Sequence, residues 1–425
     1  MPNSTDTFRI AVRKFGPFEN AMQKFWDQFC SISGCTMKLE MSIMDLHDLY
    51  NTTLAQNGLK NGDFDIAHIN TDWIYEGYVN QSFELLNPYI NKNKPADFPN
   101  GWSRSLLGLQ RFGWEIVGLP FHDGPECFIY RKDLFENPAE RLNYEKRYGQ
   151  QLEIPKTWED FWQIARFFNR PDQNFYGCIF AGYPDGHNTV FDFCLQLWTR
   201  GGSLTDKSEQ ININTAEAEE ALNFYRAIVK DSNAVHPKSV ELDSVGAGKA
   251  FANGEAAMMI NWFGFAAMCE VDAQSKVKGT VGVDLLPAKT GKESASLNVY
   301  WLYTVGAGSK NKQLAYDFLR FALAPEQDKA LTLEGGIGCR ISTWNDAEIN
   351  EKIPYYHKLE ALHQVANMLP QHKNWAAIAK IIDKMVLKAI DSAIPSATLL
   401  EQAQSEIFKL NHPHEYNVQT PVTQI

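Results

Sequence analysis

The sequence predicts an α/β protein with two lobes and a parallel, doubly wound sheet. Three observations predict this fold class. The chain has 425 residues, more than one ordinary hydrophobic core holds. Strand and helix patterns alternate up to Tyr78, which is typical of a parallel sheet covered by helices. Further strands and helices follow without a Pro/Gly/Ser-rich linker, so we expect segments of the main sheet to join the lobes.

The first elements are short apolar strands that each lead into a helix. In order they are strand 8–12, helix 19–29, strand 37–43, helix 45–56, strand 65–69 and a helix through Tyr78. Ligands of doubly wound sheets sit beyond the carboxyl ends of the strands. The turns Phe15–Pro17, Asn70–Trp73 and His122–Gly124 all fall at such ends. We therefore expect these three turns to meet at one site.

The stretch Gly118–Asp133 organises the rest of the chain. Two apolar runs, 115–119 and 127–130, read as strands on either side of a polar turn that contains His122, Asp123 and Gly124. We expect this turn to be exposed, to mark the crossing from one lobe to the other, and to face a ligand cleft.

The remaining elements follow in a mixed order. Thr157 and Asp160 are spaced as the cap of a helix that carries Phe161, Ile164 and Phe168 inward. The other predicted strands are 176–180, 256–260, 280–286 and 296–305. The other predicted helices are 189–200, 216–231, 245–253, 311–323, 325–333, 354–368, 375–390 and 397–410, with a polar tail after them.

Composition excludes several classes of protein. The net charge is −11 and Lys and Arg form no cluster, which argues against a general nucleic-acid binder. No stretch of 18 apolar residues is present, so we expect no membrane span. Residues 1–7 show no signal-peptide pattern, so we expect either a signal removed from this chain or a protein that stays inside the cell.

The seven cysteines are scattered and mostly lie in apolar surroundings, so we expect free buried thiols. Only Cys30 and Cys35 are close enough in sequence for a local disulfide, and the sequence leaves that open. No spacing typical of a metal site occurs, and we expect no cofactor.

Several segments, in their shared order, resemble the bacterial extracellular solute-binding proteins of family 1, the sugar-type receptors of ABC importers that are similar to maltose-binding protein. The strongest match is Gly118–Phe135, and the other matching segments are 64–73, 86–90, 155–161, 250–259 and 309–312. The resemblance implies the type II periplasmic-binding-protein fold, with two lobes joined by hinge segments that close on one carbohydrate. It also implies a monomer without chemistry, in the periplasm or at the cell surface, that delivers its ligand to permease subunits.

The resemblance further implies lobes that are discontinuous in sequence. The N-terminal lobe would comprise 1–121 and 288–333, and the C-terminal lobe 122–287 and 334–412, followed by a polar tail at 413–425. The segment 298–301 is bulkier than the Gly-rich strand that the family often has there.

Sugars are bound by aromatic rings and planar polar side chains, which select the candidates for ligand binding. The candidates are Phe15, Asp72, Trp73, His122, Asp123, His187, Asn188, Trp262, Tyr300, Trp301, Arg340 and Trp375. Tyr300 and Trp301 are neighbours in a predicted strand, so only one of them faces the ligand. Most candidates have an ordinary alternative. It is a helix cap for Asp72, a turn for Asp123, a surface salt bridge for Arg340, a solvated loop for His187 and Asn188, and packing for Trp73, Trp262 and Trp375.

Two other functions remain open at this point. A glycosidase needs two carboxylates that flank a bond, and Asp72, Asp123 and Glu126 are available, but no motif pairs them. Some related receptors hold ferric iron with adjacent tyrosines, and Tyr355 and Tyr356 are adjacent here, but packing is the favoured interpretation of this pair.

Overall fold

The computed structural model describes residues 7–411. These residues form two compact units, each built from several separate segments of the chain. Unit 1 comprises the described residues up to Ile129, Trp262–Asp284 and Asn298–Lys373. Unit 2 comprises Tyr130–Asn261, Leu285–Leu297 and the residues from Asn374. The lobe boundaries expected from the sequence stay a prediction; they group 122–129, 262–284, 288–297 and 334–373 differently from the two units. The polar tail at 413–425 lies outside the described residues.

Unit 1 is built on a five-stranded sheet of order β2-β1-β3-β12-β6. β1 is parallel to β2 and β3, whereas β12 runs antiparallel to β3 and β6. The strands are β1 (Thr7–Arg13), β2 (Lys38–Met44), β3 (Ile66–Asn70), β6 (Leu119–His122) and β12 (Trp301–Val305). All five residues of β3 are buried, as expected for a central strand with both faces covered.

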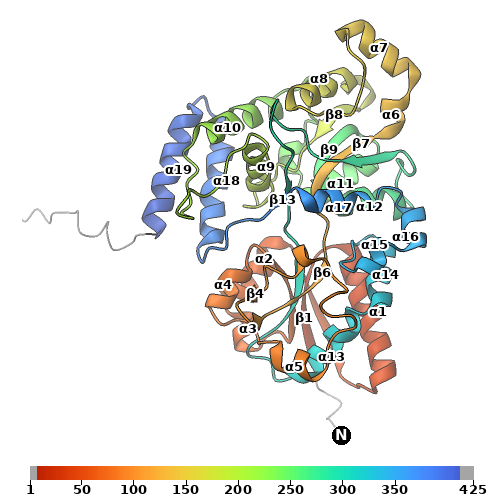
Figure 1. Cartoon of the computed structure of the whole chain (residues 1–425), viewed down its shortest axis with the longest axis vertical. Coiled ribbons are helices and arrows are strands. Elements are labelled where there is room, and N and C mark those ends of the chain that lie inside the picture. The colour runs from red at the N-terminus through yellow and green to blue at the C-terminus, as the bar shows by residue number, and fades with distance from the viewer. Residues whose placement is uncertain (1–6, 412–425) are drawn as a thin grey trace, which may run out of the picture. The chain divides into compact units, whose positions relative to one another are not determined.

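The helices of unit 1 cover both faces of this sheet, with α1, α13 and α14 on one side and α3 and α4 on the other (Figure 1). α1 buries an apolar stripe that includes Phe18, Met22, Phe25 and Trp26. The helices and turns of unit 1 are α1 (Gly16–Ser33), α2 (Leu46–Tyr50), η1 (Asn51–Ala55), α3 (Gly58–Asn61), α4 (Ile74–Val79), α5 (Asn87–Lys92), η2 (Arg104–Leu106), α12 (Phe263–Val271), α13 (Lys312–Ala322), α14 (Pro325–Leu333), α15 (Ile341–Trp344), α16 (Ala347–Lys352) and α17 (Lys358–Gln364). Its short strands are β4 (Arg111–Phe112), β5 (Glu115–Ile116), β10 (Val281–Asp284) and β13 (Ala366–Asn367).

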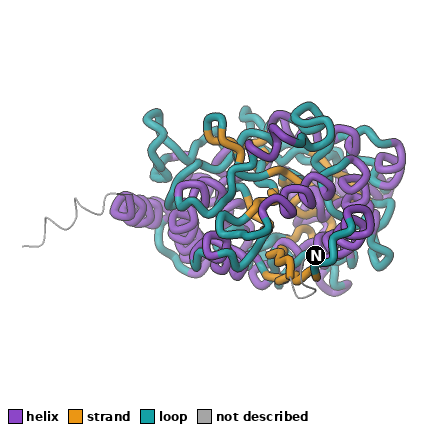
Figure 2. The backbone as a smooth tube through the Cα atoms, turned by 90° about the horizontal axis from the view of Figure 1, so that it is seen from below, coloured by secondary structure: helices purple, strands orange, loops and turns teal. Residues whose placement is uncertain are grey.

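Unit 2 contains a parallel pair, β8 (Tyr176–Ile179) and β9 (Ala256–Trp262), with Cys178 opposite Met258. These strands belong to a four-stranded sheet, and β7 (Glu126–Arg131) carries the chain from unit 1 into unit 2. The other elements are α6 (Lys132–Glu136), α7 (Pro138–Tyr148), α8 (Trp158–Phe168), η3 (Pro171–Gln173), α9 (Asn188–Trp198), α10 (Ala216–Val229), η4 (Ser239–Glu241), α11 (Ser244–Ala252), β11 (Ser296–Leu297), α18 (Trp375–Asp391) and α19 (Ser396–Asn411). Helices and loops surround the strands (Figure 2).

Most predicted elements are present, with differences where tertiary contacts interrupt a local pattern. Thr157 caps α8 as predicted, because its Oγ1 accepts from the amide of Asp160 at 3.1 Å. The strand predicted at 296–305 is broken at 298–300, and the helix predicted at 354–368 is reduced to α17. Among residues 7–411, no helix is long and apolar enough to cross a membrane.

Candidate functional site

Four strands of the unit 1 sheet place polar and aromatic residues at one end of the sheet. The antiparallel strand β12 starts at Trp301, which lies opposite Asn70, the last residue of β3, and opposite His122, the last residue of β6. Phe15 follows β1 and its ring centroid lies 6.2 Å from that of His122. This is the carboxyl edge at which doubly wound sheets bind ligands. We call Phe15, Asp72, Trp73, His122, Asp123 and Trp301 together the strand-end site.

Asp123 is the buried acid of the strand-end site. Its Oδ2 accepts a hydrogen bond from Nε2 of His363 on α17 at 2.7 Å. Its amide donates to the carbonyl of Ile337 at 3.0 Å. Its Oδ1 is buried and has no hydrogen-bond partner. An unpartnered carboxylate oxygen is costly in a protein interior, so this oxygen is a strong candidate to accept a ligand hydroxyl.

The predicted exposure of the His122–Gly124 turn is wrong. Asp123 is 2% exposed and Gly124 is buried, while His122 is half-buried. The reason is that the residues around Ile337 and His363, more than two hundred positions later in sequence, pack over the turn and bond to it.

His122 is a neutral hydrogen-bond donor. Burial lowers its pKa to about 4, although the charge of Asp123 opposes this shift. Its Nδ1 lies 2.9 Å from the amide of Ile337 and accepts from it. The proton of the neutral ring therefore sits on Nε2, where it is available to an oxygen of a ligand. The ring is held against Phe18, with centroids 4.7 Å apart.

Trp301 and Phe15 are the aromatic residues of the strand-end site that keep exposed surface, and Trp301 lies at the start of β12. Trp301 is half-buried, and its ring meets the rings of Trp73 and Phe18 edge to face, at centroid distances of 6.0 Å and 6.2 Å. Trp73 itself is 2% exposed and packs on Tyr50. Trp73 therefore supports Trp301, which presents surface on which the apolar face of a sugar ring can pack.

Tyr300 is fully buried beside Trp301. Its hydroxyl donates to Oε1 of Gln110 at 2.7 Å and accepts from the amide of Leu109 at 3.2 Å. Burial raises the pKa of this hydroxyl. Of the two neighbours in the sequence, Trp301 is the one with surface to offer a ligand.

Asp72 belongs to the strand-end site, and Trp262 precedes a segment that passes beside it. Asp72 is half-buried, and its amide donates to Oδ1 of Asn70 at 3.3 Å. Trp262 is half-buried at the end of β9. The residues after Trp262 lie next to the strand-end site. The amide of Phe263 donates to the carbonyl of Pro125 at 3.1 Å. Gly264 is so close to the His122 ring that a Cβ there would lie 3.7 Å from it.

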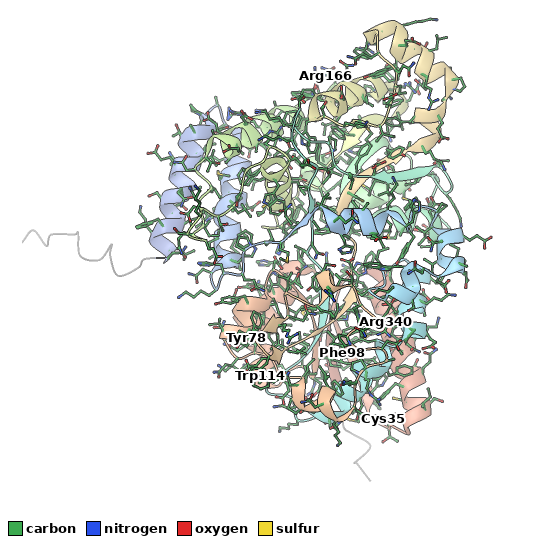
Figure 3. All side chains as sticks on the ribbon, in the orientation of Figure 1. Cys35, Tyr78, Phe98, Trp114, Arg166 and Arg340 are labelled. Carbon is green, nitrogen blue, oxygen red and sulfur yellow. The ribbon has the colours of Figure 1, made fainter. Side chains whose placement is uncertain are left out.

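Arg340 lies in unit 1, in contact with the segment 96–102 (Figure 3). It is 1% exposed, its guanidinium lies 4.0 Å from the Trp102 ring centroid, and it donates to the carbonyl of Ala96 at 2.9 Å. Arg340 also forms an ion pair with Asp97, at 3.3 Å. The salt bridge expected as the alternative is therefore present, but the arginine in it is buried and does not lie on the surface.

The other three candidates lie in unit 2. The carboxylate of Asp185 accepts from the amides of His187 and Asn188 at 2.9 Å and 3.0 Å. The His187 ring packs on Phe191, and Asn188 is 6% exposed at the start of α9. Trp375 is 1% exposed at the start of α18, and its Nε1 has no partner.

The structure also places the residues of the two rival functions. Tyr355 and Tyr356 are buried, and the hydroxyl of Tyr355 donates to the carbonyl of Ala266 at 2.5 Å. Within residues 7–411, no group of three His, Cys, Asp or Glu side chains is arranged to hold a metal ion. Glu126 is 5% exposed.

A family model described as "Bacterial extracellular solute-binding protein" matches residues 26–349. The chain belongs to this family of bacterial extracellular solute-binding proteins. The resemblance stated from the sequence is therefore confirmed. Among curated relatives, a probable ABC transporter-binding protein of Deinococcus radiodurans is 24% identical over 83% of this chain and 80% of its own length. A mannitol-binding protein of Pseudomonas aeruginosa is also 24% identical, over 84% and 82% respectively.

Solved structures show the same fold. A solute-binding protein of Agrobacterium radiobacter in complex with ribitol has a TM-score of 0.84 at 22% identity and covers 95% of this chain and 98% of its own. Maltose-bound MalE3 of T. maritima has a TM-score of 0.83 at 21% identity, over 96% and 100%. The predicted α/β, two-lobed periplasmic-binding-protein fold is confirmed.

Sequence reasoning missed the residues that hold the strand-end site in place. His363, Ile337 and Gln110 come from segments far from their partners, and none belongs to a motif that pairs it with one. Phe18 was recognisable as an apolar helix residue, but its ring contacts with both His122 and Trp301 depend on the sheet register.

Proposed function

We propose that the protein is the substrate-binding component of an ABC importer and that its strand-end site binds a sugar or a sugar alcohol. One observation carries the proposal: the site joins an acceptor, Oδ1 of Asp123, a neutral donor, Nε2 of His122, and the partly exposed ring of Trp301. The family assignment and the names of relatives that bind mannitol, ribitol or maltose support it.

The chemistry of the three groups suits a polyhydroxylated ligand. Each hydroxyl both donates and accepts, so one hydroxyl can donate to Asp123 while another oxygen accepts from His122. The carbon-bound hydrogens of the ligand can then pack on Trp301. Asp72 and Trp262 border the same edge and are proposed as further contacts, with Phe15 and Trp73 packing behind them.

Three parts of the proposal rest on the family. The ligand is held by two lobes that close on it, the closed form delivers it to permease subunits outside the cytoplasm, and the receptor is a monomer. The other candidates from the sequence are still proposed either to contact the ligand or to support residues that do. They are His187, Asn188, Arg340, Tyr300 and Trp375. Small-angle scattering with and without ligand tests closure and oligomeric state together, because closure lowers the radius of gyration of a monomer without raising its mass.

A thermal-shift screen tests the ligand class. The panel is mannitol, ribitol, tagatose and maltose, with a polyamine and a dipeptide as controls of other chemistry. A ligand present at 100 times its Kd stabilises the folded state by about 2.7 kcal/mol. We expect at least one sugar or polyol to raise the melting temperature and the controls to leave it unchanged. The carbohydrate assignment fails if no member of the panel does so.

We also propose that binding involves no chemistry. Ligand recovered after prolonged incubation should be unchanged by mass and by chromatography. Hydrolysis of a glycoside that is lost in Asp123→Asn would establish a carbohydrate-active enzyme instead.

A further inference from the structure

The carboxyl-terminal end of α1 is closed by a left-handed glycine between two cysteines. Gly34 has φ 72°, and its amide donates to the carbonyl of Cys30 at 3.0 Å. Cys35 follows directly, and its amide donates to Oγ of Ser33 at 3.3 Å. In this type of helix stop, the side chain after the left-handed residue packs against the residue that supplies the bonded carbonyl. Here those two residues are Cys35 and Cys30.

The helix stop places the two cysteines near each other at the end of α1. Both side chains pack on the edge of the unit 1 core, and Cys35 is one of the neighbours that raise the pKa of Cys30. Neither thiol is bonded to the other, since all seven cysteines are free. The helix stop therefore places two reduced thiols near each other.

Cys30 and Cys35 also differ from the other cysteines in exposure. Both are partly exposed, whereas Cys127, Cys178, Cys194, Cys269 and Cys339 are buried. Cys35 lines an open groove of about 1210 Å³ together with Ile32, Gly34 and Phe321. Figure 3 shows Cys35 at the edge of unit 1. A small disulfide reagent can reach this thiol, and it cannot reach the five buried ones without unfolding.

We propose that Cys30 and Cys35 form a dithiol–disulfide site. A small-molecule disulfide such as oxidised glutathione oxidises the two thiols to an intramolecular disulfide bond. This bond links the end of α1 to the start of the segment that leads into β2. The site is separate from the strand-end site and does not depend on the proposed ligand.

The reaction proceeds by two thiol–disulfide exchanges. The Cys35 thiolate attacks one sulfur of the oxidant, forms a mixed disulfide and releases the first small thiol. Cys30 then loses its proton and attacks the Cys35 sulfur, which forms the Cys30–Cys35 bond and releases the second small thiol. The protein loses two electrons and two protons, and the oxidant is reduced to two thiols. Cys35 acts first because it lines the groove; in addition, burial and the neighbouring thiol raise the pKa of Cys30 to about 11, which disfavours its thiolate.

Redox titration of the folded protein tests the proposal. The protein is equilibrated with mixtures of reduced and oxidised glutathione, quenched in acid, alkylated in denaturant and weighed by mass spectrometry. We expect the oxidised form to lose two of its seven alkylatable thiols and two hydrogens, without added glutathione. Trypsin cleaves after Lys24 and Lys38, so both changes should fall on the single peptide 25–38. Melting temperature should rise on oxidation because the bond restricts the unfolded chain.

Single variants separate the alternatives. Cys30→Ser should stop at the mixed disulfide and retain one glutathione on Cys35, whereas Cys35→Ser should show no change at Cys30. Gly34→Ala strains the left-handed position and should require a higher proportion of oxidised glutathione. Wild-type protein that ends with glutathione on Cys35, that links to a second copy, or that keeps both thiols at every ratio would overturn the proposal. Circular dichroism confirms that each variant is folded.

Discussion

Nε2 of His363 lies 2.7 Å from Oδ2 of Asp123, and the two side chains are only 7% and 0% exposed. The bond connects α17 to the end of β6 and fixes the carboxylate whose other oxygen, Oδ1, is left without a partner. Burial alone would lower the pKa of His363, but the charge of Asp123 and the hydrogen bond outweigh it, so the pKa is raised. The pair therefore holds a charged acceptor at the strand-end site.

Asp123→Asn should weaken both the fold and ligand binding. The change removes the charge that compensates buried His363, and breaking a buried ion pair costs about 3 kcal/mol. Urea unfolding measures the loss of stability and calorimetry measures affinity for the ligand found in the screen. Asp63→Asn, at an exposed position of unit 1, is the control and should change neither. Full affinity in Asp123→Asn would show that the carboxylate does not contact the ligand.

Stability should fall as the pH rises through the raised pKa of His363. The folded pKa lies above the ordinary value near 6.5, so the folded state binds the proton more tightly than the unfolded chain. The contribution is fully present below pH 6.5 and is lost above the folded pKa. Urea midpoints between pH 6 and pH 9 measure it. His363→Gln should remove this slope, and a slope that persists in that variant would assign it to another group.

Stability should also fall on the acid side, because of buried neutral histidines. His68 is 0% exposed, and burial lowers its pKa to about 3, with a smaller effect from His122. The unfolded chain binds a proton near pH 6.5 that folded His68 does not, so stability decreases by about 1.4 kcal/mol per pH unit below that value. His68→Gln keeps an acceptor for the amide of Arg13 and should flatten the curve between pH 6 and pH 4. An unchanged acid slope would contradict a neutral His68.

Trp301→Ala should lower ligand affinity about tenfold, which corresponds to about 1.4 kcal/mol of lost ring packing. Trp114, which is 66% exposed on unit 1 (Figure 3), is the matched control. Trp114→Ala should leave affinity unchanged. Calorimetric titration of the two variants side by side measures the difference, and equal affinities would remove Trp301 from the site.

Thr157→Ala should cost unit 2 about 1 kcal/mol, because the amide of Asp160 loses its cap. Thr157→Ser keeps the oxygen and should remain within a few tenths of a kcal/mol of wild type. Urea unfolding of both variants provides the measurement. A serine variant as unstable as the alanine variant would show that packing of the Thr157 methyl group, and not the cap, carries the effect.

Local chemistry made several features of this protein predictable. The apolar stripe of α1, the cap at Thr157 and the strand–turn–strand arrangement around His122–Gly124 each depend on residues close together in sequence. The order of such segments also predicted the family and the fold class. The same reasoning placed Phe15, Trp73 and His122 at strand ends, since periodicity locates where a strand stops.

Only the tertiary structure decided how these residues are used. It buried Asp123 under α17, gave it His363 as a partner, and left Trp301, not Tyr300, with exposed surface. It also set Trp301 opposite both Asn70 and His122 through an antiparallel strand from a distant part of the chain. The sequence by itself determined most of the elements, the cap at Thr157 and the apolar face of α1, because these follow from interactions within a few residues. Burial, partners and pKa values followed from the tertiary structure, because they depend on segments that meet only when the chain is folded.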